Sequence, residues 1–462
     1  MNRRWLVIFG FLLVSTQVAQ AQDKNVYGLT ADDLKARQVD GRTVVDLIRP
    51  VLTQEESVLS SDFGIDEGNG FVRFWGNVLV VEAEDTLRAE RIRYNQNTKI
   101  GVAEGNVFLT DGLADLRAPL ATHYSDEERT EFEDGVTYAD SSGTLSAARA
   151  VYYTDINKAV FFDDVTFIQD DTSVYADSVE YAREEDISEA WGRVLVDSKT
   201  DTTQSLLLSD YLYRNAITDS IAVRGNSRLV SVNTQDSDTL FVSADRMFLV
   251  ERDSLNTITA IDSVVVSSPN YALKGDSLRT TNWKDDRRLS KTFGEPMAWL
   301  DENQISADSL FFRSGSAWPD SASVDLVSGF GSVFVASRDS LSGRINQLKG
   351  RRLKAVLYQD SLQSMLVEEN AEALIYTREN PEDPLTAGVG SGDGVLLRFV
   401  QGELSEVAFY SGIKLLYYAE NLLEQVSNLD GYQWNPELMP DRAVLSSQFW
   451  AEIQFRRRSE EH

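Results

Sequence analysis

Few residues in this sequence could carry covalent or acid–base chemistry. The chain has 462 residues and no cysteine, which excludes a thiolate nucleophile, a thiolate metal site and a disulfide. It has two histidines, and His462 is the last residue of the sequence. His123 precedes Tyr124 in a strand-like segment, which favours a solvent-facing or hydrogen-bonded strand residue over a general base or a metal ligand.

Three pairs of adjacent acids could act as glycosidase carboxylates or calcium ligands: Asp163-Asp164, Asp170-Asp171 and Asp285-Asp286. They sit at the ends of expected strands, where Asp favours turns, so we interpret them as turn or surface residues. Acids are abundant throughout, with 73 Asp and Glu against 44 Lys and Arg and a net charge of −29. Such a surface repels nucleic acid and anionic lipid headgroups, which are poor partners for the bulk of the chain.

A glycine-rich stretch runs from Gly388 to Gly394, with glycines at every second position. It does not complete a dinucleotide-binding fingerprint, because Asp393 stands where the last glycine is needed and no helical pattern follows. No Gly-x-Ser-x-Gly motif with a histidine partner is present either. We therefore expect no enzyme activity, no catalytic residue, no metal site and no cofactor.

The elements that would position any site are short β-strands that repeat with a period near 30 residues. One repeated element is a Gly-Asn-Val-like start followed by alternating apolar residues, and Gly-Asn suits the positive φ of hairpin turns. These starts are Gly76-Asn77-Val78, Gly105-Asn106-Val107, Gly135-Val136, Asp164-Val165, Gly192-Arg193-Val194 and Gly225-Asn226.

A second repeated element places an apolar residue two positions before a small one, with an aromatic or apolar residue further on. Its copies begin at Leu87-Arg88-Ala89, Leu116-Arg117-Ala118, Leu145-Ser146-Ala147, Val174-Tyr175-Ala176, Val242-Ser243-Ala244 and Ile305-Ser306-Ala307. Both elements have the β-branched and aromatic composition of strands, and helical periodicity is nearly absent between residues 66 and 380. One unit cannot bury its own apolar face but stacked units can, so the sequence predicts an all-β fold with a long array of stacked strands.

The sequence divides into five expected regions. Arg3-Arg4, an apolar run and Ala19-Gln20-Ala21 predict a signal peptide over residues 1–21 and an exported protein. Residues 22–65 are expected to be a leader or an irregular first layer, and 66–380 the repeat array. Residues 381–394, rich in Pro and Gly, predict a loop. Residues 395–462 predict further strands, a short helix near Leu422 to Leu429 and a solvated basic end at Arg456-Arg457-Arg458.

The two-part repeat resembles the OstA/LptA family of lipopolysaccharide-transport proteins, from about Phe71 to Tyr376. The ending Gly431-Tyr432-Gln433-Trp434-Asn435-Pro436-Glu437 also looks like the tail of OstA-like proteins from Bacteroidota-type bacteria. The resemblance implies an antiparallel β-jellyroll in the periplasm, open along one side, that holds the acyl chains of lipopolysaccharide. It also implies partners among other lipopolysaccharide-transport components, joined by edge-strand pairing.

Alternation selects the side chains that would line such a slot. They are Val78, Val80, Val107, Leu109, Val136, Tyr138, Val165, Phe167, Val194 and Val196. These residues could instead fill a sealed core, as in a structural or adhesive cell-surface β-repeat protein without a lipid ligand. A carbohydrate-active enzyme on a β-helix would need acids and aromatics clustered on one face, which the repeats do not show. We expect a periplasmic lipid-binding bridge protein.

Overall fold

The computed structural model is mostly β, with 72% of the described residues in strands, and this confirms the predicted all-β antiparallel class. The predicted signal peptide lies outside the described residues. No helix in the described part of the chain is long and apolar enough to cross a membrane. The structure describes residues 28–54, 57–82, 85–153, 156, 158–182, 185–233, 239–252, 254–285, 287–315, 324–339, 342–359, 361–378, 382–400 and 402–458.

The chain divides into two compact units, of which unit 1 contains residues up to 198 together with 213–217. Its strands are β1 (Gly28–Thr30), β2 (Asp33–Val39), β3 (Arg42–Ile48), β4 (Val51–Gln54), β5 (Ser57–Ser60), β6 (Phe63–Asp66), β7 (Phe71–Glu82), β8 (Asp85–Asn95), β9 (Ile100–Thr110), β10 (Asp115–Tyr124), β11 (Arg129–Glu133), β12 (Val136–Asp140), β13 (Gly143–Ala147), β14 (Arg149–Tyr153), β15 (Lys158–Gln169), β16 (Thr172–Ala182) and β17 (Ile187–Lys199), with a 3-10 turn η2 (Ser125–Glu127).

Unit 2 contains residues 199–212 and 218–457. Its strands are β18 (Thr203–Asn215), β19 (Ser220–Asn233), β20 (Thr239–Arg252), β21 (Leu255–Ser267), β22 (Tyr271–Trp283), β23 (Arg288–Phe293), β24 (Met297–Leu300), β25 (Asn303–Ser306), β26 (Ser309–Ser314), β27 (Asp325–Arg338), β28 (Ile345–Tyr358), β29 (Ser361–Thr377), β30 (Thr386–Val400), β31 (Glu403–Tyr410) and β32 (Lys414–Tyr418). Three helical segments follow: η3 (Glu420–Gln425), η4 (Pro436–Leu438) and α1 (Arg442–Arg458).

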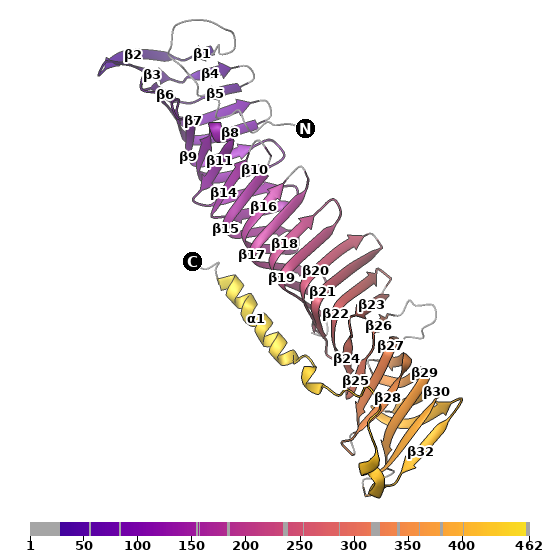
Figure 1. Ribbon diagram of the computed structural model, residues 1–462. Helices are drawn as coiled ribbons and strands as arrows, with labels where there is room; N and C mark the ends of the chain where they lie inside the picture. Colours follow the sequence, from indigo (N-terminus) through magenta and orange to yellow (C-terminus); the bar gives the residue numbers. More distant parts are fainter. Residues whose placement is uncertain are drawn as a thin grey trace. The chain divides into compact units, whose positions relative to one another are not determined.

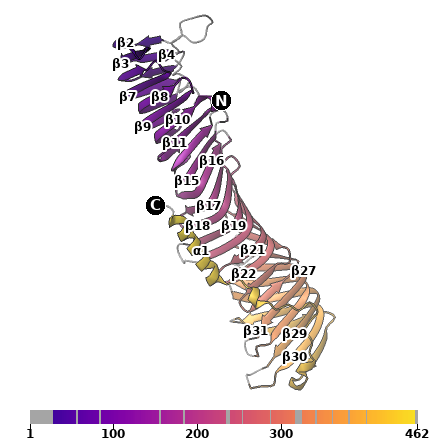
Figure 2. The same cartoon turned by 60° about the vertical axis from the view of Figure 1, so that its left-hand side comes forward.

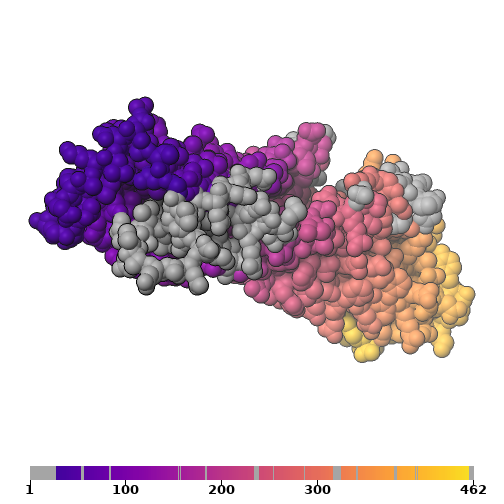
Figure 3. Space-filling model, turned by 90° about the horizontal axis from the view of Figure 1, so that it is seen from above, coloured from indigo at the N-terminus to yellow at the C-terminus, as the bar shows by residue number. Residues whose placement is uncertain are grey.

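Within each unit the long strands pair antiparallel with their neighbours in sequence, as β7, β8 and β9 do in unit 1 and β20, β21 and β22 in unit 2. The strands are therefore stacked in chain order inside each unit (Figures 1 and 2). The space-filling view shows the same order as successive bands of colour (Figure 3). Sequence-neighbour pairing is what a repeat of strand and hairpin produces, because short hairpin connections leave no room for crossovers.

A two-residue bend divides most long strands into two segments, and we call it the corner. In β7 the corner is Gly76-Asn77, where φ is 76° and 49° and the register with β8 shifts between Trp75 and Val78. Corners recur at Gly105-Asn106 and Gly225-Asn226, again with both φ values positive. The predicted positive φ is confirmed, but the interpretation as a hairpin turn is wrong. Gly-Asn lies at a bulge in mid-strand, where the extra residue bends the strand.

A carboxylate from the neighbouring strand packs against the corner and links the two repeated elements. Asn77 donates a hydrogen bond through Nδ2 to Asp62 Oδ2 at 2.8 Å, and Asn106 donates to Glu90 Oε1 at 2.7 Å. A Cβ added at Gly76 would lie 2.6 Å from that Asp62 oxygen. Glycine at this position therefore provides both the left-handed φ and the room for the acid.

The corners fold each unit into two facing layers. Layer A contains the strand segments after the Gly-Asn corners of β7 and β9, and layer B contains the segments before them. In unit 1, Tyr138 of layer A lies 6.1 Å from Phe161 and 6.2 Å from Tyr181 of layer B, measured between ring centroids. In unit 2, Tyr271 of layer A stacks at 5.8 Å on Phe312 of layer B. Each unit thus encloses an apolar interior between two layers, as a β-jellyroll does.

Two expected regions differ from the structure. Residues 28–66 form the six short strands β1 to β6, which pair with one another and with β7, rather than an irregular leader. The expected loop at 381–394 is a strand from Thr386 onward, because β30 begins there. Its glycines allow close approach rather than turning: a Cβ at Gly390 would meet the Phe409 ring at 2.6 Å.

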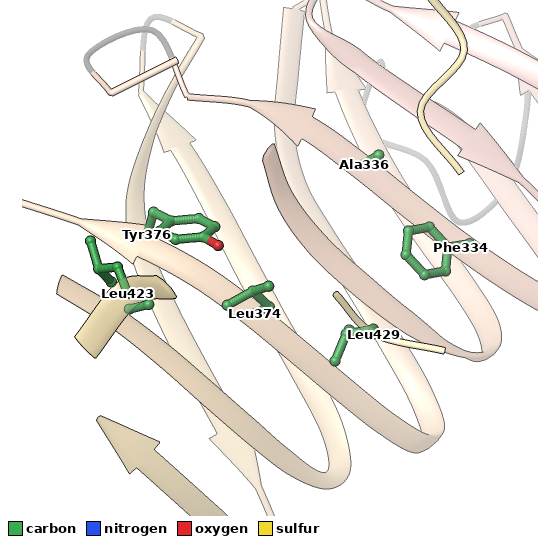
Figure 4. Close-up of a cluster of buried hydrophobic side chains, with 7 residues drawn as sticks. Phe334, Ala336, Leu374, Tyr376, Leu423 and Leu429 are labelled. Atoms are coloured by element: carbon green, nitrogen blue, oxygen red, sulfur yellow. The ribbon is translucent and has the colours of Figure 1, made fainter. Parts of the chain in front are cut away.

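The residues after β32 form a segment that sequence reasoning largely missed, and we call residues 419–458 the C-terminal strap. The expected short helix is the 3-10 segment η3, and a longer helix, α1, was not predicted. Leu423 and Leu429 of the strap pack in a cluster with Phe334, Leu374 and Tyr376 (Figure 4). Further along, Phe449 of α1 packs edge-on against Phe241 at 6.2 Å.

The C-terminal strap covers one cross-strand row on the outward side of layer A in unit 2. The row is buried, with exposed fractions of 7% or less, although it faces away from the interior. The corresponding row of unit 1 is largely polar, with Thr86, Asp115 and Thr144, and it includes the half-exposed Ile168. The covered row is Val230, Phe241, Ser267, Ala272, Trp299, Gln304, Ala336, Gln347 and Leu374.

Candidate functional site

The ten predicted slot residues all lie in layer A of unit 1, on strands β7, β9, β12, β15 and β17. The pairing register joins five of them, through their partners on the intervening strands, into one row across the layer. We call this the interior row. It consists of Val80, Leu87, Leu109, Leu116, Tyr138, Leu145, Phe167, Val174 and Val196.

The other predicted residues lie next to the corners. Val107 faces Ala118, Val136 faces Ala147 and Val165 faces Ala176 in the register. The second repeated element thus supplies the alternate strands: its apolar residue joins the interior row and its small residue opposes the corner valine. Small residues fit there because the two layers converge at the corner. The predicted apolar residues therefore share one face, which follows from the period-two geometry of strands.

Burial varies along the interior row. Val80 is 1% exposed and Leu109 is 7% exposed, whereas Tyr138, Phe167 and Val196 are only partly buried. The corner residues Val78, Val107, Val136, Val165 and Val194 are all buried. The layers are therefore closely packed around β7 to β10, while apolar side chains of the row keep accessible surface from β12 to β17.

The side chains expected to point outward are less buried than their neighbours. Leu79 and Phe108 are partly exposed, on either side of the buried Val78 to Val80 and Val107 to Leu109 pairs. Arg117 lies over the Phe108 ring, 4.3 Å from its centroid, which places this ring at the outer surface. In β7 and β9 the predicted slot side chains therefore point inward, and the side chains between them point outward.

His123 belongs to layer B, and its side chain is buried at 2% exposure. Its Nδ1 lies 2.9 Å from Thr130 Oγ1 on β11, and burial lowers its pKa to about 4. The side chain is thus a hydrogen-bonded strand residue, which was one of the two expected states, and not a solvent-facing one. Desolvation thus favours the neutral imidazole at physiological pH.

The paired acids are turn and corner residues. Asp163 and Asp164 form the corner of β15 with φ of 63° and 53°, and Asp170 lies in the β15–β16 hairpin with φ of 47°. Asp285 is bound by Arg287, which lowers the pKa of its carboxyl, and Asp286 lies outside the described residues. Within the described ranges, no cluster of three or more His, Asp or Glu side chains could hold a metal ion.

The functional features missed by sequence reasoning are the C-terminal strap and its contacts. Gln304 and Gln347, each 1% exposed, form hydrogen bonds with residues of the C-terminal strap. Consecutive apolar residues such as Leu206-Leu207-Leu208 and Ala298-Trp299-Leu300, buried on both sides of a strand, are the signal in the sequence. A strand with one free face alternates, so apolar residues on both faces indicate a covering element.

The fold and its apolar interior define a class: antiparallel two-layer β-repeat proteins with an apolar inner face. Residues 57–187 match the family model described as LptA/(LptD N-terminal domain) LPS transport protein. This part of the chain is an LptA/LptD N-terminal (OstA-like) domain, which confirms the resemblance of the repeats up to residue 187. The family is one of transport proteins. No curated protein sequence matches the chain.

Proposed function

We propose that the chain carries lipopolysaccharide through the periplasm by holding its acyl chains against the interior row of unit 1. The single observation that supports this most is the position of the family match. Residues 57–187 contain nearly the whole interior row, and the LptA family acts in lipopolysaccharide transport in the periplasm. The proposal includes no catalytic step, no metal and no cofactor.

The acyl chain is the part of lipopolysaccharide that the interior row suits. The row is apolar across successive strands, which lie roughly 4.8 Å apart, so an extended acyl chain would contact several strands at once. Burial of each CH2 contributes about 0.8 kcal/mol, so chains of ordinary length need no headgroup attraction. The net charge of −29 also favours binding through the acyl chains, because it does not attract an anionic headgroup.

The partly exposed section of the row is the proposed place of first contact. Tyr138, Phe167 and Val196 retain accessible surface, so a chain can touch them without prior separation of the layers. Contact with Val80 or Leu109, which are 1% and 7% exposed, requires the layers to part or an acyl chain to replace protein packing. We therefore expect Phe167 to label before Val80.

Edge-strand pairing with other lipopolysaccharide-transport components is the second part of the proposal. In the described pairings β31 and β32 each have β30 as their partner, which leaves the outer side of both strands available. An available edge of this kind can pair with a strand of another protein. The family match supports this because LptA-type proteins work with other Lpt components.

Photo-crosslinking tests the proposal for the interior. A photo-reactive residue at Phe167, Leu109 or Val80 is expected to crosslink to lipopolysaccharide, most strongly at Phe167. The matched controls are the next residues along the same strands, Thr166, Phe108 and Leu79, which should label weakly. A one-residue shift moves a side chain to the other face, so the contrast isolates the face.

Two outcomes would contradict the proposal. Equal labelling of both sets would show that lipopolysaccharide binds without regard to the face of layer A. Absence of labelling at all six positions would favour the alternative, a structural or adhesive β-repeat protein with a sealed interior. The close packing around Val78 and Val107, both 1% exposed, is the observation that keeps this alternative in view.

A further inference from the structure

The outward side of layer B in unit 2 combines aromatic and cationic side chains. Two adjacent cross-strand rows there, which run over β22, β23, β26, β27 and β28, carry both kinds of residue. We call this surface the basic aromatic face. It consists of Arg279, Lys291, Phe293, Phe311, Phe330 and Lys354.

The aromatic part of the face is a contiguous cluster that is open to solvent. The Phe311 ring centroid lies 5.9 Å from that of Phe293 and 5.1 Å from that of Phe330. Phe293 is 43% exposed and Phe330 is 39% exposed, and the C-terminal strap covers the other layer. Grouped exposed rings of this kind are uncommon on soluble surfaces and mark a site of interaction.

The three cations of the face form no ion pair among the described residues, although the corner carboxylates Asp276 and Asp308 border the face beside Phe293 and Phe330. Lys291 lies over the Phe311 ring, with Nζ 5.2 Å from the centroid. Arg279 and Lys354 are exposed, and neither has a carboxylate within ion-pair distance among the described residues. By contrast, the flanking Arg246 and Arg352 are paired with Asp262 and Glu369.

The same side of layer B in unit 1 also carries cations and the exposed, stacked rings of Phe63 and Trp75, but Arg73 there is paired with Glu67. Arg91 there pairs with Glu104 at 3.4 Å, and its neighbouring rows contain Glu131 and Glu180. The basic aromatic face thus differs from its counterpart in unit 1 in the pairing of its cations, within a chain of net charge −29. The expectation that anionic lipid headgroups are poor partners for the bulk of the chain does not apply to it.

We propose that the basic aromatic face binds the surface of an anionic phospholipid bilayer. Arg279 and Lys291 lie opposite each other on β22 and β23, and Lys354 lies three strands further along the same row, so the cations are spread over the face rather than gathered as a site for a discrete anion would require. A bilayer offers anionic charge over the whole area of such a face, together with an apolar layer just below it. Phenylalanine rings enter that layer while cations remain at headgroup level.

Flotation with vesicles tests this proposal on the full chain. Vesicles of equal parts phosphatidylglycerol and phosphatidylcholine, free of lipopolysaccharide, should bind the protein, and pure phosphatidylcholine vesicles should not. Each cation near an anionic surface contributes enough that R279Q/K291Q/K354Q should weaken binding about a hundredfold. Phe293→Ser with Phe330→Ser should weaken it about tenfold or more, because both rings are exposed and their loss leaves the fold intact.

Matched variants in unit 1 serve as controls. R73Q/R91Q/R93Q removes the same number of cations from the corresponding side of layer B, and Ile168→Ser removes a half-exposed apolar side chain. Neither should change vesicle binding. Equal binding to both vesicle types, or equal losses in the control and test variants, would overturn the proposal.

A protein partner is the other outcome that the experiment can reveal. Sedimentation velocity without vesicles would then show self-association that R279Q/K291Q/K354Q abolishes, with no flotation of the original protein, and this would overturn membrane binding. Because the vesicles contain no lipopolysaccharide, failure here leaves the interior photo-crosslinking result unaffected, and the two proposals fail independently.

Discussion

His123 gives the fold a pH response of defined sign. Its buried imidazole has a pKa of about 4, against about 6.5 in an unfolded chain. Above about pH 6.5 both states are neutral and the histidine has no effect on stability. As the pH falls from about 6.5 to about 4, the unfolded chain binds a proton that the folded chain does not, so stability is lost.

We expect this loss to reach about 3 kcal/mol below about pH 4. His123→Asn keeps a polar group near Thr130 but removes the titration. The free energy of unfolding of the original chain, measured by urea denaturation, should therefore fall relative to that of His123→Asn across this range. A constant difference between the two proteins would show that His123 titrates normally in the folded state. The subtraction removes the contribution of the many acids, which both proteins share.

The corner glycines show how a single residue bends a strand. Gly76→Ala should destabilise unit 1 through two effects, the left-handed φ of 76° and a contact of 2.6 Å between the new Cβ and Asp62 Oδ2. Gly112→Ala is the matched control, because its φ is 80° and no atom lies within 4 Å of the added Cβ. We expect about 1 kcal/mol for Gly112→Ala and about 2–3 kcal/mol for Gly76→Ala.

Removal of the acid separates the two effects. The Asp62 Cβ also lies 2.9 Å from the added Cβ, so the whole side chain must be removed. In G76A/D62G the contact is absent, so the cost of the glycine substitution should return to about that of Gly112→Ala when referred to Asp62→Gly. Urea denaturation of the four variants provides the comparison. An unchanged cost in the double variant would mean that the carboxylate does not pack against the corner.

At the scale of elements, two buried amides hold the C-terminal strap. Gln347 donates through Nε2 to Asn428 Oδ1 at 2.7 Å and accepts from the Leu429 backbone N–H at 2.8 Å. Gln304 donates to the Gln433 carbonyl at 3.1 Å and accepts from the Asn435 backbone N–H at 2.7 Å. Because both side chains are buried, their loss leaves strap backbone groups without partners.

Q304A/Q347A should therefore loosen the C-terminal strap by about 1–3 kcal/mol for each lost pair. Hydrogen exchange of the Leu429 and Asn435 amides reports this directly, and both should exchange faster by a factor of ten or more. Gln363→Ala is the control, since the Gln363 amide is exposed and bonds only locally, to the Ser361 carbonyl at 3.2 Å. Equal protection in both variants would show that apolar packing alone retains the strap.

The sequence predicted the strands and the inward face of the repeats, because period-two alternation is a local property of each strand. It did not predict that Gly-Asn would lie in mid-strand, since a positive φ serves a turn and a bulge equally well. It also missed the C-terminal strap. The hydrogen bond between Gln347 and Leu429 joins residues 82 positions apart, which a local sequence pattern does not reveal. The sequence of α1 likewise does not indicate which strands the helix packs against.

The basic end at Arg456-Arg457-Arg458 was predicted to be solvated, but Arg456 is buried. Arg456 is 8% exposed, and its guanidinium donates from Nη1 to the Ser209 carbonyl at 2.8 Å. It also bonds Glu452 at 2.8 Å, one helical turn earlier. A run of arginines is polar in composition, so only the docking of α1 reveals that one of them is an anchor.

At the scale of the molecule, the edge strands β2 and β32 differ in how they are protected. β2 is exposed throughout and carries Lys35 and Arg37, charges that discourage pairing with another chain. β32 instead presents Leu416 and Tyr417, which are 61% and 75% exposed. An apolar edge favours association with a further strand, so we expect β32 rather than β2 to mediate contacts.

Concentration-dependent sedimentation velocity examines this expectation. L416K/Y417K places charge on β32 and should lower self-association at least tenfold, whereas Leu34→Lys on β2 should have little effect. Leu34 is 52% exposed, so the control also changes an exposed edge residue without disturbing the core. If Leu34→Lys has the larger effect, the assignment of the two edges is reversed.

The C-terminal strap also has a consequence in time. A chain is synthesised from its N-terminus, so unit 1, in which the corresponding outward row of layer A is largely polar, can fold as soon as its own strands have emerged. Unit 2 cannot complete its folding as soon as its strands have been synthesised. Val230, Trp299 and Leu374 remain uncovered until residues 419–458, which are made after them, arrive to cover them. Until then the incomplete unit exposes an apolar surface on the outward side of layer A. A chaperone that binds nascent chains is expected to act on this surface.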